Sequence, residues 1–590
     1  MKKLTGLCLA FMLVLSACTP SSQEAPAKFK AGSYSGSAKG MNGDVVLEVT
    51  LSEEKIESIT VTEQQETAGL GDAAIDRMIE NIISSQSIQV ETVSGATVSS
   101  NAVLTAVTNA LSEAGVDAST LEPKTEDKQT SVEDATADIV VIGGGGAGLS
   151  AAIEAADAGT EKIIVLEKML NTGGTTATAQ GMIAGYETKV QKASKDEPIT
   201  YDAMVANLMN NALWKLDPAL TKITVESSGQ TIDWLIDRAE VEFQPDALVG
   251  YGPLKMMHVV DGFGPSLVEH LTSTAEKAGV EIRTENKAVE ILMDENQNVS
   301  GVVVETADGT YTIHTKAVIL ATGGYSYNPE LTALLDPEKA GTFGIGHPSN
   351  TGDGLIMASN VGAALTHTNH LMAVLKDYEI MKDYNGTSNS ANISKFIAQE
   401  NLVLVGQDAK RFVDEKSGGY MTQLLNEPIF DQMHKEGAEF VWAISDQATI
   451  DAAEIKRGEN LAFITADTAE ELAAKMNLDP AVLKETIDNY NAYAAAGADP
   501  EFKRTVMKPL ASPYVAVAVV PCEIITYGGV ARNENSEVIR ADNTVIKGLY
   551  AAGEVSANSA YMGFTLSNAV TWGRIAGENA SAFRAGIPPS

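Results

Sequence analysis

A glycine-rich segment that begins at residue 143 carries the clearest chemistry in this sequence. Gly143, Gly145 and Gly148 have the spacing Gly-x-Gly-x-x-Gly. The first glycine permits a tight turn, the second lets a pyrophosphate approach the backbone, and the third lets a helix pack on a strand. The N-terminus of that helix then faces the phosphates. Alone the pattern is weak, so the neighbouring residues decide its meaning.

The residues around these glycines follow the order strand, turn, helix, strand. Asp138 is followed by an apolar run to Ile142, which suits a strand buried on both faces, and residues 163–166 form a second run. The helix between them is rich in alanine. This order predicts a parallel sheet. Glu167 ends the second strand, where a carboxylate can accept hydrogen bonds from a ribose. The segment therefore predicts a dinucleotide site.

FAD and NAD share this fingerprint, so later segments must choose between them. Small residues at 171–176 and 179–182 would let an isoalloxazine ring and its diphosphate lie against the backbone. Further motifs follow at residues 317–324, 351–354, 548–554 and 573–577.

In this order the motifs resemble an FAD-dependent family that contains fumarate reductase flavoproteins, flavocytochrome c, urocanate reductase and 3-ketosteroid dehydrogenases. The resemblance covers about residues 138–580. It implies non-covalent FAD, with Glu554 by the ribityl chain, Asp353 near the flavin, and Thr565 and Leu566 at the pyrimidine end. The other residues it implies for FAD binding are Gly143, Gly145, Ala147, Gly148, Glu167, Lys168, Gly174, Thr175, Thr176, Gly181, Met182, Val289, Thr322 and Gly323.

The resemblance also implies an α/β fold with three folded units. A Rossmann-type FAD-binding domain would occupy residues 137–365 and 520–590. An α+β capping domain, residues 366–519, would be inserted in it and close over the substrate. A small α+β FMN-binding domain, residues 31–115, would precede both, followed by a polar linker at 116–136.

The N-terminal unit has its own motif. Val45, Leu47, Val49 and Leu51 alternate with more polar residues, which predicts a half-buried strand, and a helix is expected from Asn101 to about Ala114. Residues 92–100 precede that helix and resemble the Ser-Gly-Ala-Thr motif of FMN-binding domains. In those domains a flavin transferase joins FMN to the threonine hydroxyl. Thr97 is the matching residue, and residues 66–71 resemble a flavin-lining loop. A Ser/Thr-rich helix cap is the alternative.

The leader predicts export. Residues 1–17 have a basic start and an apolar run of about 12 residues, as in a signal peptide. The run ends in Leu-Ser-Ala-Cys, which resembles a bacterial lipobox with Cys18 as the acylated residue. An ordinary cleaved signal is the alternative. We expect residues 18–30 to tether an extracytoplasmic protein that a lipid anchors to the bacterial cell membrane.

Composition narrows the functional classes. The formal net charge of −36 would repel nucleic acid. The three cysteines include no Cys-x-x-Cys-His and no cluster for an iron–sulfur centre, so we expect no metal. Electrons would pass from a membrane donor through FMN to FAD.

The substrate side departs from the family pattern. Fumarate reductases of this family clamp two carboxylates with arginines and histidines, and an arginine donates the proton. Residues 410–415 resemble the segment before that donor, whose own position falls near residues 418–420, without an arginine. The carboxylate-binding arginine falls at Ala560. A carboxylate in a dehydrated cleft is costly unless it is paired, so a dicarboxylate is disfavoured.

The histidine positions depart as well. One family histidine falls within residues 524–530, which contain none, and the histidine that opens the capping domain falls near Val374. His367 and His370 lie close to that position. His258 is interpreted as structural.

Tyrosines stand near the altered positions. Tyr420, Tyr527 and Tyr561 are candidate catalytic residues, because a phenol can donate a proton or a hydrogen bond to an enone. Residues 561–563 resemble a tyrosine–glycine element of 3-ketosteroid dehydrogenases. Ordinary packing is the alternative for each tyrosine.

The leading hypothesis is an ene-reductase acting on a conjugated C=C of a small unsaturated carbonyl compound. Hydride would pass from FAD to the β-carbon, and a tyrosine would protonate the α-carbon. The alternatives are the reverse desaturation and a non-catalytic electron-transfer lipoprotein.

Overall fold

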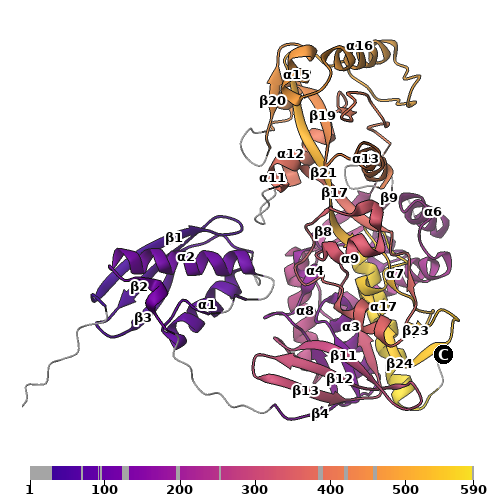
Figure 1. Cartoon of the computed structure of the whole chain (residues 1–590). Helices are drawn as coiled ribbons and strands as arrows, with labels where there is room; N and C mark the ends of the chain where they lie inside the picture. Colours follow the sequence, from indigo (N-terminus) through magenta and orange to yellow (C-terminus); the bar gives the residue numbers. More distant parts are fainter. Residues whose placement is uncertain are drawn as a thin grey trace, which may run out of the picture.

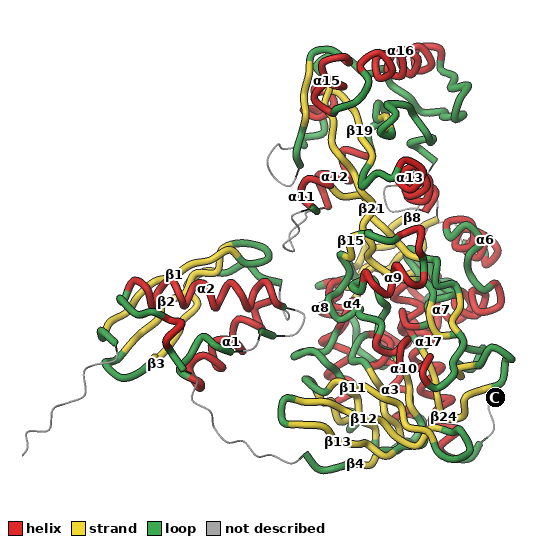
Figure 2. Tube along the Cα trace, viewed as in Figure 1, coloured by secondary structure: helices red, strands yellow, loops and turns green. Residues whose placement is uncertain are grey.

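A computed structural model places a small N-terminal unit beside a larger body from which a cap projects (Figures 1 and 2). It describes residues 29–67, 71–90, 92–93, 96–122, 132–194, 199–251, 254–382, 390–417, 423–455 and 461–587. The expected signal peptide, Cys18 and Tyr420 lie outside these residues. Among the helices so described, none combines the length and the apolar character needed to cross a membrane.

The N-terminal unit is an antiparallel sheet covered by two helices. Its elements are β1 (Gly32–Lys39), β2 (Asp44–Leu51), β3 (Ile56–Glu63), α1 (Gly71–Ser85) and α2 (Thr97–Glu113), with β2 central. Val45, Leu47, Val49 and Leu51 are all buried in its core. Burial of each such apolar side chain stabilises the folded state by roughly 1.5–3 kcal/mol. The alternation seen in the sequence therefore marks the core face of β2.

Helix α2 begins at Thr97, earlier than the Asn101 expected from the sequence. Serines favour caps and turns because their hydroxyls compete for backbone groups. Here those hydroxyls have tertiary partners instead. Ser100 Oγ accepts the Val93 N–H at 3.1 Å, and Ser99 Oγ donates to the Glu66 carboxylate. The serines are thus free to lie within the first turn of the helix.

Both ends of the expected linker 116–136 are structured. Ala118 and Leu121, in and after η1 (Ala118–Thr120), are buried in the core of the N-terminal unit. At the other end, β4 (Ala135–Thr136) pairs with β13 (Gly309–His314) of the body. Because the segment is polar overall, its composition did not predict these two structured ends.

The body is built on a six-stranded sheet in the order β10-β6-β5-β14-β24-β23. Its strands are β5 (Ile139–Ile142), β6 (Ile163–Leu166), β10 (Glu281–Arg283), β14 (Val318–Leu320), β23 (Glu537–Ile539) and β24 (Val545–Ala551). All neighbours pair in parallel except β23 and β24. The predicted Rossmann-type α/β fold is therefore confirmed.

Two helices cross closely on this sheet. They are α3 (Gly146–Asp157), which follows β5, and α17 (Thr565–Arg584), near the C-terminus. A Cβ on Gly573 would lie 2.3 Å from the Ala147 carbonyl oxygen, and one on Gly577 would lie 2.2 Å from that of Ala151. Only glycine permits this approach. The glycine motif at 573–577 thus joins the two ends of the body.

The other elements of the body surround this centre. A second sheet holds β11 (Lys287–Met293), β12 (Val299–Thr306), β13 and β4; a third holds β7 (Met182–Ala184), β8 (Phe243–Tyr251) and β9 (Leu254–Val260); and β16 (Leu365–Thr366) pairs with β22 (Gly529–Val530). The helices are α4 (Gly174–Thr178), α5 (Lys189–Ala193), α6 (Tyr201–Asn211), α7 (Pro218–Asp237), α8 (Phe263–Lys277), α9 (Pro329–Leu335), η2 (Pro337–Lys339), α10 (Asp353–Asn360) and η3 (Gly553–Val555).

The cap is organised around one long strand, β21 (Tyr514–Thr526). Strands that pair in its sheet are β15 (Phe343–Gly344), β17 (Leu371–Asp377), β18 (Val403–Val405), β19 (Val441–Asp446) and β20 (Ile464–Ala466). Its helices are α11 (Tyr378–Met381), α12 (Ser390–Ile397), α13 (Gln423–Glu436), α14 (Gln447–Ala452), α15 (Ala469–Met476) and α16 (Pro480–Ala496).

The expected domain borders fall inside strands. The border at 519/520 lies within β21, and that at 365/366 lies within β16. Residues 515–523 of β21 are buried throughout, which is typical of a strand covered on both faces. The strand runs without a break from the cap sheet to the body, so composition alone gives no boundary there.

Glu523 on β21 gives the protein a predicted pH dependence. Its carboxylate accepts a hydrogen bond from Thr332 Oγ1 at 3.1 Å, and burial raises its pKa to about 8. The folded chain therefore keeps this proton at pH values where the unfolded chain releases it. Stability from this group is present below the ordinary pKa of about 4.5 and is lost as pH rises through 8.

We expect Glu523→Gln to remove that loss. Thermal unfolding should show its Tm above that of the native protein by a few degrees at about pH 8.5, with little gain at about pH 5. Glu534→Gln, at an exposed site, serves as the control. An equal Tm difference at both pH values would contradict the assignment.

Candidate functional site

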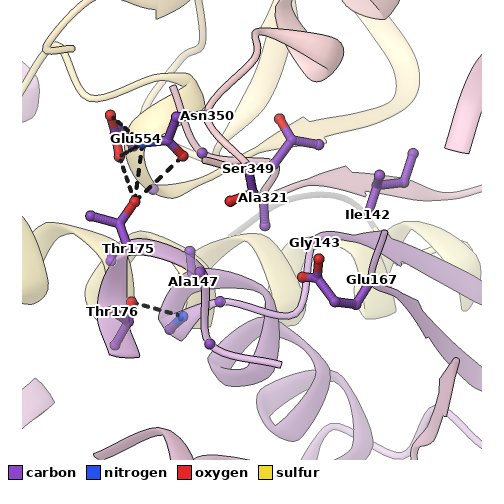
Figure 3. A pocket seen from close by; sticks show the side chains of 18 of the residues that line it. Ile142, Gly143, Ala147, Glu167, Thr175, Thr176, Ala321, Ser349, Asn350 and Glu554 are labelled. Carbon is purple, nitrogen blue, oxygen red and sulfur yellow. Dashed lines mark hydrogen bonds between the residues drawn. The ribbon is translucent and has the colours of Figure 1, made fainter. Parts of the chain in front are cut away.

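A cavity opens at the carboxyl ends of the central strands and is lined by the first residues of α3 and of α17. Figure 3 shows some of the side chains that line it. The cavity lies at the place where a doubly wound sheet binds ligands. The residues predicted for FAD that line it are Gly143, Gly145, Ala147, Glu167, Lys168, Gly174, Thr175, Thr176, Thr322, Gly323, Asp353, Glu554, Thr565 and Leu566.

The glycine turn has the shape that a pyrophosphate needs. Gly143 has φ +109°, and a Cβ there would lie 2.2 Å from the Ala321 carbonyl oxygen. A Cβ on Gly148 would lie 1.9 Å from the Gly143 carbonyl oxygen. At Gly145 a Cβ would meet only the Gly173 carbonyl oxygen, at 3.5 Å. Gly143 and Gly148 are thus required by the chain, whereas the space beside Gly145 is left for a ligand.

Glu167 and Lys168 fix one end of the cavity. The buried Glu167 carboxylate accepts the Gly144 N–H at 2.9 Å and the Met169 N–H at 2.8 Å. Burial raises the pKa of Glu167, although these hydrogen bonds oppose the shift. Lys168 Nζ lies 2.6 Å from the Asp353 carboxylate, which ties β6 to α10. A ribose hydroxyl in this position would meet acceptors that the backbone already holds in place.

A second polar group lies around Glu554. Its carboxylate accepts hydrogen bonds from Asn350 Nδ2 at 3.2 Å and Thr175 Oγ1 at 3.4 Å (Figure 3). It also accepts the Thr526 N–H at 3.1 Å. Desolvation raises the pKa of Glu554 to about 7. The group joins four segments of the chain, around residues 175, 350, 526 and 554.

Several lining residues were missed by sequence reasoning. Asn350 and Ser349 directly precede the motif at 351–354, so a wider reading of that motif would have included them. Ile525, Ala557 and Asn568 were not singled out, because strand β21, the loop after η3 and the first turn of α17 bring them to the cavity only in the fold.

Four of the residues predicted for FAD do not line the cavity in the part of the chain described. Gly148 acts through helix packing, as shown above, and Gly181 packs against the start of α8, where a Cβ would lie 2.7 Å from Phe263 Cα. Met182, the first residue of β7, packs against a methionine-rich buried cluster. Val289 stands at a bulge of β11, and its neighbour Ala288 faces the cavity instead.

Two of the candidate tyrosines belong to a buried aromatic cluster next to the cavity. The ring centroids of Tyr527 and Tyr561 are 4.9 Å apart, and His370 stacks on Tyr561 at 5.6 Å. Tyr561 Oη accepts the Gln423 N–H at 3.0 Å, whereas Tyr527 Oη contacts Met372 Sδ at 3.4 Å. Neither Tyr527 nor Tyr561 is among the residues that line the FAD cavity, although Ala560, next to Tyr561, does line it. Their catalytic role stays a prediction.

The histidines near the cavity are held neutral. Burial lowers the pKa of His370 to about 3 and that of His347 to about 4. His258 is buried, with Nε2 2.9 Å from Thr188 Oγ1, and burial lowers its pKa too. That contact fits the structural interpretation of His258. None of these three rings supplies a positive charge near neutral pH.

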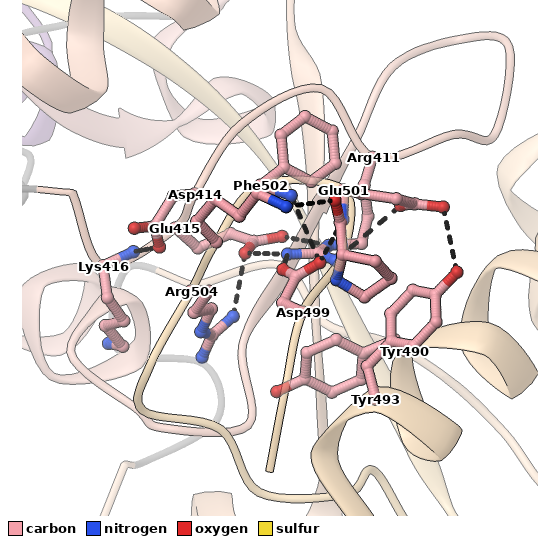
Figure 4. A network of polar contacts seen from close by, with 12 residues as sticks. Arg411, Asp414, Glu415, Lys416, Tyr490, Tyr493, Asp499, Glu501, Phe502 and Arg504 are labelled. Carbon is pink, nitrogen blue, oxygen red and sulfur yellow. Dashed lines mark hydrogen bonds and ion pairs between the residues drawn. The ribbon is translucent and has the colours of Figure 1, made fainter. Parts of the chain in front are cut away.

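The segment that resembles the approach to a proton donor is locked in an ion network (Figure 4). Glu415 binds Arg411 at 2.8 Å and Arg504 at 2.8 Å, and Arg411 also binds Asp499 at 3.0 Å. All four side chains are buried. Removing one charge would leave its partners unpaired, which costs about 3–5 kcal/mol. The network therefore holds the cap together.

Comparison of the sequence with known protein families identifies two flavin-binding domains. The FAD binding domain family matches residues 138–568, and the FMN-binding domain family matches residues 40–112. The chain is 30% identical to an NADH:acrylate oxidoreductase from Vibrio harveyi, over 95% of this chain and 62% of the relative. It is 28% identical to a urocanate reductase from Eggerthella lenta, over 97% of this chain and 96% of the relative.

A solved structure shares the architecture. The open conformation of a flavocytochrome c3 fumarate reductase is 28% identical, with a TM-score of 0.61, and the match covers 76% of this chain and 79% of that one. The resemblance inferred from the motifs is confirmed, as is the presence of the two flavin-binding domains. The chain spans less than two thirds of the Vibrio harveyi relative.

Two alanine substitutions separate the roles of the glycines. Gly148→Ala should lower both protein stability and FAD content, because its Cβ would collide with the backbone. Gly145→Ala should lower FAD content alone, because its Cβ would make only an ordinary contact with the protein, at 3.5 Å from the Gly173 carbonyl oxygen, but would collide with a bound pyrophosphate. Flavin absorbance per chain and thermal unfolding of the apoprotein measure the two effects. Full FAD content in Gly145→Ala would show that no phosphate lies there.

Proposed function

We propose that this FAD-dependent oxidoreductase, which belongs to the family defined by the FAD binding domain, reduces the conjugated C=C of an unsaturated carbonyl compound less anionic than fumarate. Bound FAD would supply hydride chemistry in the cavity beside α3. FMN on Thr97 would supply the electrons. The proposal rests on the character of the cavity wall at the end assigned to the flavin pyrimidine.

That wall is neutral and largely apolar. It includes Ile525, Ala557 and Ala560 together with Thr565 and Asn568. Ala560, which lines the cavity, occupies the position at which the family resemblance places a carboxylate-binding arginine. His370, close behind, has a pKa of about 3 and carries no charge at neutral pH. A dicarboxylate would therefore lose its hydration without gaining a cation.

The cluster behind the wall supports an aromatic or apolar substrate. Tyr527, Tyr561, Met372 and Met562 pack with Ala557 and Ala560 in one buried group. Methionine and aromatic side chains adapt to flat apolar ligands. Among the described tyrosines we favour Tyr561, because it directly follows Ala560, which lines the cavity, and because a phenol can donate a proton. Tyr420 remains a second candidate from the sequence.

The physiological setting is also proposed. Acylated Cys18 would anchor the protein outside the cytoplasm, a flavin transferase would attach FMN to Thr97, and a membrane donor would reduce that FMN. The match of residues 40–112 to the FMN-binding domain family supports the second of these steps. The first rests on the lipobox-like leader alone.

Substrate preference tests the main proposal. Anaerobic turnover with a reduced dye is measured against fumarate, a monocarboxylic enoate, and aryl and steroid enones. We expect enones and aryl enoates to be reduced and fumarate to be poor. Ala560→Arg should raise the activity ratio of fumarate to enone, by about tenfold for each 1.4 kcal/mol that the new ion pair contributes. Activity confined to fumarate in the native protein would contradict the proposal.

Peptide mass spectrometry tests the two covalent modifications. Protein from the native host should carry FMN on the peptide that contains Thr97 and acyl chains on an N-terminal Cys18. Thr97→Ser offers the same hydroxyl group, while Thr97→Ala should carry no FMN. An unmodified Thr97 in native protein would break the relay, and an unacylated N-terminus would remove the anchor.

A further inference from the structure

A second cavity lies between the N-terminal unit and the body. Its volume is about 410 Å³, within the range of about 300–1,000 Å³ that small-molecule sites occupy. The N-terminal unit contributes Thr67 and Val93. The body contributes Met169, Leu170, Asn171, Thr172, Gly174, Ala177, Thr178, Pro265, Val268, Glu269, Thr272, Ser273, Glu276 and His347.

Both contributions of the N-terminal unit come from its FMN motifs. Thr67 belongs to the loop at 66–71, and Val93 lies four residues before Thr97. The two segments are tied together, because Ser99 donates to Glu66 and the Asn42 N–H donates to the same carboxylate at 2.9 Å. The side of the unit that the motifs mark for FMN is thus the side that opens on the cavity.

On the body side the cavity is lined by one face of α8. Pro265, Val268, Thr272 and Glu276 recur at helical spacing, and the opposite face of α8 is buried in the core through Leu267 and Leu271. The charged side chains of the lining, Glu269 and Glu276, are both acidic. They would repel a phosphate but leave the apolar walls open to a flat neutral ring.

The wall between this cavity and the FAD cavity is thin. Gly174, at the start of α4, lines both cavities. It has no side chain to separate them, and its φ of +50° favours glycine. A second link is the hydrogen bond of 2.7 Å between His347, which lines the second cavity, and Ser349, which lines the first. Groups in the two cavities would be separated by a single residue.

An ion pair supports this arrangement of the two units. Arg77 on α1 binds Glu285, which precedes β11. Both side chains are partly exposed, so the ion pair stabilises the contact between the two units by about 1 kcal/mol or less. Its main effect is on the orientation of the N-terminal unit relative to the body. It offers a direct way to disturb the docking without touching either cavity.

We propose that the second cavity holds the isoalloxazine ring of FMN in the docked state, and that electrons reach FAD across Gly174. This inference rests on the relay proposed above and adds its route. Reduced FMN gives up two electrons and FAD takes up the same two. One proton leaves the first ring and one enters the second, both exchanged with water. The cavity is a docking site shared by the two units, completed only when they meet.

A matched pair of substitutions on α8 tests the site. Ser273→Phe would fill the cavity, whereas Lys277→Phe places the same ring on an exposed position outside its lining. The full-length holoprotein is used, with FAD and FMN content determined first. Two quantities are measured: quenching of FMN fluorescence by iodide, and the rate of electron transfer to FAD after pulse reduction of FMN.

We expect Ser273→Phe to expose FMN to iodide and to slow the transfer by about tenfold or more, equal to about 1.4 kcal/mol of barrier. Lys277→Phe should match the native protein in both measurements. Arg77→Glu should weaken docking in the same direction, and the double reversal of Arg77→Glu with Glu285→Arg should restore it. Recovery of both quantities in the double variant would show that Arg77→Glu acts by weakening docking and not by unfolding the protein.

The outcomes distinguish this inference from the relay itself. If native FMN passes electrons to FAD but Ser273→Phe and Arg77→Glu change neither quantity, the docking site is wrong and the relay stands. If native FMN never reduces FAD, the proposed relay fails and the route fails with it.

Discussion

The close approach of α3 and α17 is the constraint on which the rest of the molecule depends. Gly573 and Gly577 bring α17 against the Ala147 and Ala151 carbonyls, distances that a Cβ would make impossible. The N-terminus of α3 forms the glycine turn, and the first residues of α17 line the other end of the same cavity. One helix crossing thus sets the length and the two ends of the FAD site.

Several ionisable side chains in the body are held in their neutral form by burial. Burial favours the protonated form of Glu554 and Glu523 and the neutral form of His370. Within the cap, buried charges are paired, as in the network of Arg411, Glu415 and Arg504, whereas the buried Arg532 of the body has the hydroxyls of Ser556 and Ser559 as partners. The cavity wall itself is neutral at Ala560. The buried acids Glu554 and Glu523 have raised pKa values, so the protonation of the molecule changes near neutral pH.

Strand β21 and the segment around α4 explain how separate units work as one enzyme. Strand β21 carries the cap sheet and ends at Thr526, whose N–H binds Glu554 at the FAD cavity, so cap and cavity share one continuous element. The α4 segment has a cavity on each side of it. Covalent continuity thus links the cap to the site, whereas the N-terminal unit meets the body at the second cavity, which is lined by α8, α4 and loops.

The sequence by itself determined what depends on local geometry. The glycine spacing, the strands at 139–142 and 163–166 and the alternation in β2 follow from backbone sterics and side-chain period, which act over a few residues. Tertiary structure alone decided which side chains meet. Ala288 rather than Val289 faces the cavity because of a bulge, the first turn of α2 holds Ser99, whose hydroxyl has a distant partner in Glu66, and Tyr527 and Tyr561 are buried by a cluster drawn from five elements and loops. These outcomes depend on contacts between residues far apart in the chain, and no local pattern encodes them.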